Sequence, residues 1–181
     1  SPTSGSAPGN DPLYLMFRSN SDTSKNKYKD EMGKRYYFKP GLPNSSLIQV
    51  GTKAIWFESV NNIIYIWGFG TISKVSDIVK NKETTGESYI WKAVEMDDFH
   101  ILDQSGTPGQ LGEPPTQAQF KLPPDVQNRL EHSEHYNNQI PIIKIDQKMY
   151  DTITGGGEGW PTDPATIGLE LPSKDKILKF K

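Results

Sequence analysis

Two β-rich runs on either side of an asparagine turn place the tightest limit on what this chain can fold into. Residues 53–59 (KAIWFES) and 63–72 (IIYIWGFGTI) are dense in β-branched and aromatic residues, and Val60-Asn61-Asn62 lies between them. Such runs around such a turn predict a β-hairpin. Gly68 and Gly70 interrupt the second run, which predicts a bulge or a sharp bend of the kind that a closing barrel requires.

Both faces of this hairpin are expected to be apolar. Successive side chains of a strand alternate between its two faces, and large apolar residues occupy consecutive positions in both runs. One face can form the core, so the other must be covered or must bind something flat. The expected faces are Ile55, Phe57 and Ser59 against Trp56 and Glu58 in the first run, and Tyr65, Trp67 and Phe69 against Ile64, Ile66 and Ile72 in the second.

The other predicted elements are short. A helix over 124–135 follows Pro123, and a second over 148–153 ends at the glycine run 155–157. Further strands are expected at 13–17, at 88–96, at 99–102 as an extension or a new strand, and at 140–145. The sum predicts an α+β domain: a small, partly open mixed β-barrel with one to three short flanking helices.

The length and composition fit one domain. Residues 1–10 contain only Ser, Pro, Thr, Gly, Ala and Asn, which is typical of a disordered linker or tag remnant, so we expect one folded domain over 11–181. The 4 Trp, 8 Tyr and 7 Phe side chains are enough for a modest core. No apolar run approaches the length of a membrane helix or a signal peptide, so we expect a cytoplasmic protein with no membrane partner.

The sequence carries no recognisable catalytic or metal-binding motif. Cysteine is absent, which excludes disulfides and thiolate chemistry. His132 and His135 are three residues apart and Ser133 follows the first of them, so the zincin pattern does not match. Residues 155–159 (GGGEG) lack the Lys-Ser/Thr end of a phosphate-binding loop. We therefore expect no catalytic residue, no metal and no cofactor.

The formal net charge of −2 conceals an uneven distribution. Residues 18–39 hold seven Lys or Arg against three Asp or Glu, whereas residues 101–181 hold eight against eleven. Basic side chains that contact phosphates supply affinity and salt dependence, although a solvated charged loop is the alternative interpretation. The candidate phosphate-binding residues are Arg18, Lys25, Lys27, Lys29, Lys34, Arg35 and Lys39.

Parts of the chain resemble a known family. Residues 50–59 (VGTKAIWFES) and 66–72 (IWGFGTI) resemble the central hairpin of EVE domains in the PUA-like superfamily. Residues 13–20 (LYLMFRSN) are similar to the first strand of EVE and related YTH domains, which runs into Ser and Asn at the mouth of a base pocket. The resemblance covers about residues 13–100. It departs from the family at Thr52, where an acidic residue is usual, and over the long stretch 21–46.

PUA-like domains with such insertions are similar to the N-terminal recognition domains of McrB-type, modification-dependent restriction systems. The resemblance implies a non-catalytic module that binds methylated double-stranded DNA and flips a methylated-cytosine-like base into an aromatic pocket. Motor and nuclease subunits would then cut the DNA. It also implies a base pocket with hydrogen-bonding groups at Ser19 and Asn20, a mouth residue at Ser59, and stacking walls at Trp56, Trp67 and either Tyr37 or Phe38.

Three alternatives remain open. The chain could be an RNA reader, as many PUA-like and YTH domains are. It could be a protein-interaction domain whose aromatic residues are all structural. It could also be a small enzyme acting on a nucleotide-like ligand, for which Glu58 or Asp97-Asp98 are the only plausible acid/base candidates.

Overall fold

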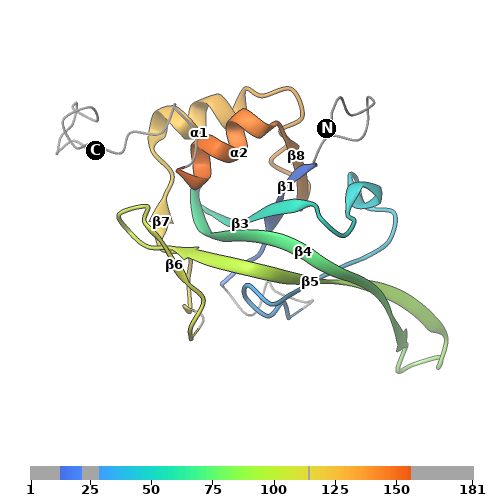
Figure 1. Cartoon of the computed structure of the whole chain (residues 1–181). Coiled ribbons are helices and arrows are strands. Elements are labelled where there is room, and N and C mark those ends of the chain that lie inside the picture. Colours follow the sequence, from blue (N-terminus) through green and yellow to red (C-terminus); the bar gives the residue numbers. More distant parts are fainter. Residues whose placement is uncertain (1–12, 22–28, 114, 156–181) are drawn as a thin grey trace, which may run out of the picture.

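One eight-stranded sheet organises the computed structural model, which describes residues 13–21, 29–113 and 115–155 (Figure 1). The sheet order is β2-β5-β4-β3-β1-β8, with β6 added to β5 and β7 added to β4. Among these strands only β1 and β3 run parallel. The strands are β1 Tyr14–Arg18, β2 Arg35–Phe38, β3 Lys53–Val60, β4 Ile63–Asn81, β5 Ser88–Leu102, β6 Pro108–Gln110, β7 Phe120–Lys121 and β8 Ile142–Ile145.

Two short α-helices, α1 (Pro124–Glu131) and α2 (Gln147–Thr154), lie together over one face of the sheet (Figure 1). A 3₁₀ turn spans Ser45–Leu47. The carboxylate of Asp146 caps α2 by accepting a 2.7 Å hydrogen bond from the Met149 N–H, and Gly155 ends the helix at φ 82°. The predicted end of this helix is therefore confirmed. The predicted helix over 124–135 stops earlier, at Glu131.

The core divides into two clusters on opposite faces of the β3–β4 hairpin. The helix-side cluster joins Ile55 and Phe57 of β3 to residues of both helices, among them Leu130 and Ile153. The tryptophan cluster lies on the other face and contains Trp56, Trp67, Leu15, Phe17, Tyr36, Phe38 and Phe99. Both faces of the hairpin are thus apolar and covered, as the alternation predicts.

The tryptophan cluster shows that the sheet curls towards closure. The rings of Phe17 in β1 and Tyr36 in β2 stack with centroids 4.4 Å apart, and the Tyr36 hydroxyl donates a 3.2 Å hydrogen bond to the Arg18 carbonyl. Yet β1 and β2 are separated by three strands in the sheet order. The strands therefore wrap around this cluster without pairing at the seam. The predicted α+β class, with a small, partly open mixed sheet and short helices, is confirmed.

A bulge at Trp67 changes which residues of β4 share a face after that position. Trp56 pairs with Gly68 and Phe57 with Ile66, so Trp67 is the extra residue. The alternation shifts by one position after it: Phe69 packs on the helix-side cluster and Ile72 joins the tryptophan cluster. The expected faces were wrong for these two residues, because simple alternation assumes an uninterrupted strand. The bulge predicted from Gly68 and Gly70 is itself confirmed.

The two longest strands extend well beyond the hairpin prediction. β4 continues from Ile72 to Asn81, and β5 runs without a break through both predicted segments, 88–96 and 99–102. β2 forms inside the basic segment, where no strand was expected, and pairs with β5 from Arg35↔Glu95 to Phe38↔Lys92. In the described ranges, neither helix has the length and apolar character needed to cross a membrane.

Candidate nucleic-acid interface

Polar groups gather at the carboxyl end of β1, on the face of the sheet that holds the tryptophan cluster. Ser19 is buried, and its N–H donates a 2.8 Å hydrogen bond to the Phe57 carbonyl. Its own carbonyl accepts a 3.3 Å hydrogen bond from the Trp67 indole N–H. The structure therefore brings together Ser19 and Trp67, two of the residues that the resemblance assigns to the base pocket.

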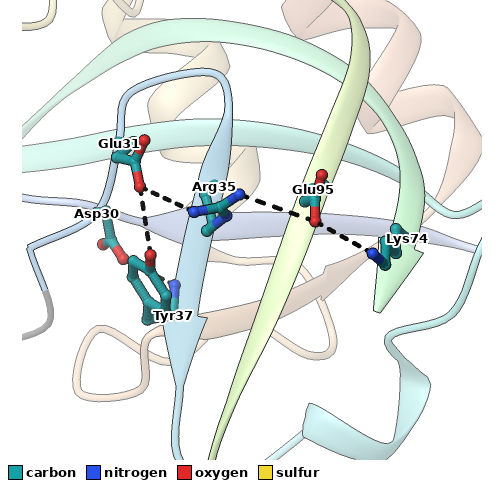
Figure 2. Close-up of polar contacts among 6 residues, drawn as sticks. All are labelled: Asp30, Glu31, Arg35, Tyr37, Lys74 and Glu95. Atoms are coloured by element: carbon teal, nitrogen blue, oxygen red, sulfur yellow. Dashed lines mark hydrogen bonds and ion pairs between the residues drawn. The ribbon is translucent and has the colours of Figure 1, made fainter. Parts of the chain in front are cut away.

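Asp30 completes this arrangement from the loop before β2. One carboxylate oxygen accepts a 2.8 Å hydrogen bond from the Tyr37 N–H (Figure 2). The other accepts a 3.3 Å hydrogen bond from the Ser19 hydroxyl. Burial raises the pKa of Asp30 from 3.8 to about 7, against the lowering effect of the two hydrogen bonds. The carboxyl group thus takes up and releases a proton near neutral pH. No sequence signal distinguishes Asp30, because it is an acid inside a basic segment.

Glu58 lies on the same face of β3 as Trp56 and is 3% exposed. One carboxylate oxygen accepts hydrogen bonds from the Ser21 hydroxyl (2.8 Å) and the Ser21 N–H (3.2 Å). The other accepts a 3.2 Å hydrogen bond from the Ala118 N–H. These bonds tie the chain after β1 to the segment before β7, so Glu58 acts as a structural anchor. We call Ser19, Ser21, Asp30, Glu58 and Trp67 the polar cluster.

Trp56 belongs to the interior of the tryptophan cluster. Its side chain has no exposed surface, and its ring lies 5.6 Å from the rings of both Tyr36 and Phe99 in edge-on contacts. Among the described residues, no acceptor faces its indole N–H. Phe38 is buried in the same way. In this structure neither ring offers a face to a base, because the curling sheet encloses both. Tyr37, which points to the opposite side of β2, is half-buried.

Ser59 and Arg18 lie away from the polar cluster, because strand alternation sends them to the helix-side face. Ser59 shares its side of β3 with Ile55 and Phe57. The Arg18 guanidinium lies 4.7 Å from the centroid of the Phe57 ring. It also donates hydrogen bonds to the Ile140 and Asn138 carbonyls, at 3.4 and 3.2 Å. Arg18 therefore anchors the loop before β8, which differs from the phosphate contact that the sequence suggested.

The other candidate phosphate ligands are placed unevenly. Arg35 lies 3.3 Å from Glu31 and 3.9 Å from Glu95, so carboxylates already face its guanidinium (Figure 2). Asn20, a candidate for the base pocket, is half-buried and follows Ser19 in the chain. Lys29, Lys34 and Lys39 are exposed, and Lys25 and Lys27 lie outside the described residues.

The remaining acid/base candidates do not assemble a second site. Asp97 and Asp98 are exposed residues of β5, next to the point where its register with β4 shifts. Across residues 13–21, 29–113 and 115–155, no group of three or more His, Asp or Glu side chains is arranged to hold a metal ion.

Comparison with known proteins yields few similarities. No protein-family model matches the chain, and no curated protein matches its sequence. A hypothetical protein from Leishmania major is 13% identical with a TM-score of 0.44, over 79% of this chain and 92% of that one. The human THYN1 protein, solved in complex with 5-methylcytosine containing DNA, is 10% identical with a TM-score of 0.42, over 82% of this chain and 99% of that one. At these scores and identities, neither likeness establishes a family or a function.

Proposed function

We propose that this chain is a non-catalytic reader of double-stranded DNA, with a PUA-like fold, that recognises a flipped, methylated-cytosine-like base at the polar cluster. One observation carries the proposal: the half-buried carboxyl group of Asp30 is held by the Ser19 hydroxyl and the Tyr37 N–H, and burial raises its pKa to about 7. Asn20 follows Ser19 in the chain, and both Asn20 and Tyr37 are half-buried.

The chemistry of this carboxyl group suits the pairing edge of cytosine. That edge carries an amino group that donates a hydrogen bond and a ring nitrogen that accepts one. A carboxylate accepts only, whereas a protonated carboxyl group both accepts and donates. Because its pKa lies near 7, Asp30 can present the protonated form at neutral pH and satisfy both atoms. An enzyme or reader that takes a base out of the duplex recognises it through hydrogen bonds to this edge.

The aromatic side chain that this proposal assigns to the base is Tyr37, which lies at the edge of β2 that binds Asp30 and is half-buried. Trp67 orients Ser19 through its indole N–H, and Trp56 fills the core behind it, so the proposal gives neither tryptophan a stacking role. The wider role, in which the folded domain over 11–181 directs motor and nuclease subunits of a cytoplasmic restriction system, is supported only by the McrB-type resemblance.

The test is a comparison of two duplexes that differ only in cytosine methylation, measured by fluorescence polarisation. We expect tighter binding to the methylated duplex, and we expect Asp30→Ala to weaken that binding because alanine offers the base neither a donor nor an acceptor. Asp125→Ala on the exposed surface of α1 is the matched control and should bind as the unaltered protein does. Equal affinity of the unaltered protein for both duplexes contradicts the modified-base proposal. Stronger competition by single-stranded RNA of the same sequence would instead favour an RNA reader.

A further inference from the structure

A two-stranded arm extends from the sheet beyond the polar cluster. It consists of residues 74–81 of β4 and 88–95 of β5, paired from Lys74↔Glu95 to Asn81↔Ser88, and it projects from the body of the domain (Figure 1). β2 covers only the base of the arm, since its last pair is Phe38↔Lys92. Most of the arm therefore has both of its faces outside the core.

One face of the arm carries a row of aromatic rings. The rings of Tyr37 and Trp91 lie 6.4 Å apart, and those of Trp91 and Tyr89 lie 6.2 Å apart. All three side chains are half-buried, so each retains some surface that water can reach. The row begins at Tyr37, whose N–H holds Asp30, and runs outward along β5. The row lies on the side of the sheet away from the tryptophan cluster and meets the polar cluster at β2, where the Tyr37 backbone binds Asp30.

A row of lysines runs beside these rings on the same face. Cross-strand partners share a face, and Lys80 pairs with Tyr89 while Ile78 pairs with Trp91. The Lys80 ammonium lies 4.8 Å from the centroid of the Trp91 ring, a cation–π contact. Lys74 pairs with Glu95 on this face, and its ammonium lies 3.9 Å from the Glu95 carboxylate. Lys82 follows two residues after Lys80, and its ammonium lies 3.3 Å from the Glu87 carboxylate. We call the rings of Tyr37, Tyr89 and Trp91 together with Lys74, Lys80 and Lys82 the aromatic–cationic face.

The opposite face of the arm has a different chemistry. Val79 and Ile90 form an exposed cross-strand pair there, at 66% and 47% exposure. Next to them, Lys92 is neutralised by Asp77 in a 2.6 Å ion pair. This face suits a partner that makes apolar contacts, whereas the aromatic–cationic face suits a flat or anionic ligand.

We propose that the aromatic–cationic face binds unpaired nucleotides of a single-stranded nucleic acid, with bases stacked on the rings and phosphates beside the lysines. Proteins that hold single strands combine these two features, because every base has a flat apolar surface and every linkage has a negative charge. The excess of positive charge lies at the base of the arm: residues 29–39 hold four Lys or Arg against two Asp or Glu, residues 74–95 hold four of each, and residues 96–113 hold four acids and no Lys or Arg. The inference extends the proposed function from the flipped base to the strand around it.

The experiment measures the binding of a labelled oligo(dT) of about 12 nucleotides, within the usual footprint of such sites, by fluorescence polarisation. Loss of one stacking ring should weaken binding, and we expect Trp91→Ala to raise the Kd at least about fivefold. Trp91→Phe should restore most of the affinity, because it keeps an aromatic surface. Ile90→Ala, on the other face of the same strand, should bind as the unaltered protein does. Lys80→Gln provides a second variant that leaves every ring in place, and it should also weaken binding.

Three outcomes would overturn the inference: no binding of oligo(dT) by the unaltered protein, unchanged binding by Trp91→Ala and Lys80→Gln, or a loss confined to Ile90→Ala. The last outcome would indicate that the apolar face is the binding surface. Asp30→Ala separates this inference from the proposed function, since it should leave oligo(dT) binding unchanged. Trp91-dependent binding of oligo(dT) without any preference for methylated duplex would uphold the arm and refute the reader proposal.

Discussion

Trp56, which the family resemblance assigns to a base pocket, lies in the core of the structure. Its indole is fully buried among aromatic rings, and its N–H has no acceptor among the described residues. We predict that Trp56→Ala lowers the free energy of unfolding by about 3–5 kcal/mol, the usual cost of removing a large buried ring. Trp56→Phe should cost less, because it keeps a ring and removes the unsatisfied donor. Urea unfolding measures both, and an alanine variant as stable as the unaltered protein would contradict the core assignment.

Asp30 makes stability depend on pH in a defined direction. Its pKa is about 7 in the folded protein against an ordinary value of 3.8, so the folded state binds a proton more tightly than the unfolded state. The stabilising effect of this proton is complete at pH values below 3.8, and it is lost as the pH rises to about 7. We predict that Asp30→Asn removes this slope and raises the thermal unfolding midpoint at pH 8.

The matched control for this measurement is Asp125→Asn, an exposed carboxylate at the start of α1. It should leave the slope between pH 4 and 7 unchanged, because the carboxyl group is exposed on the helix surface. A slope in Asp30→Asn equal to that of the unaltered protein would show that another group is responsible.

At the level of elements, the close packing of β4 on β5 depends on the absence of a side chain at Gly68. A Cβ there would overlap the carbonyl oxygen of His100 and lie 2.8 Å from the Phe99 ring. We predict that Gly68→Ala destabilises the domain by about 1–3 kcal/mol or more, as overpacking does. Gly112→Ala is the control, since a Cβ at that position meets nothing within 4 Å. Equal unfolding free energies for the two variants would contradict this account of the strand packing.

The elements that the sequence predicted are those with local signals. The hairpin turn is one: Asn61 and Asn62 both adopt left-handed backbone angles, φ 53° and 65°, which asparagine tolerates better than most residues. The far half of β4 and the whole of β2 lack such signals. These segments form strands because they pair with β5. Their polar sequences do not by themselves predict that pairing.

Over the whole molecule, basic and acidic side chains are concentrated in different regions, although the formal net charge is only −2. Residues 29–39 around β2 carry an excess of Lys and Arg over acids, residues 74–95 carry equal numbers, and residues 96–113 carry acids without Lys or Arg. We predict that binding of oligo(dT) weakens as salt increases. Replacing Lys80 and Lys82 together by Gln should reduce the slope of log K against log salt by about 0.7 for each lysine that contacts a phosphate. Lys148→Gln, exposed on α2, should leave the slope unchanged; an equal reduction there would indicate nonspecific attraction.

The sequence by itself determined the hairpin, the bulge at its glycines, the two apolar faces and the α2 end, because each depends on residues that are neighbours in the chain. Only the tertiary structure decided which side chains meet. Arg18 and Ser19 are adjacent in sequence but lie on opposite faces of the sheet, whereas Ser19 and Asp30 are hydrogen-bonded across a loop. Trp56 and Trp91 look alike in the sequence, yet one is enclosed by the curling sheet and the other lines the arm. The physical reason is that burial and pairing depend on strand order and curvature, which no short stretch of sequence specifies.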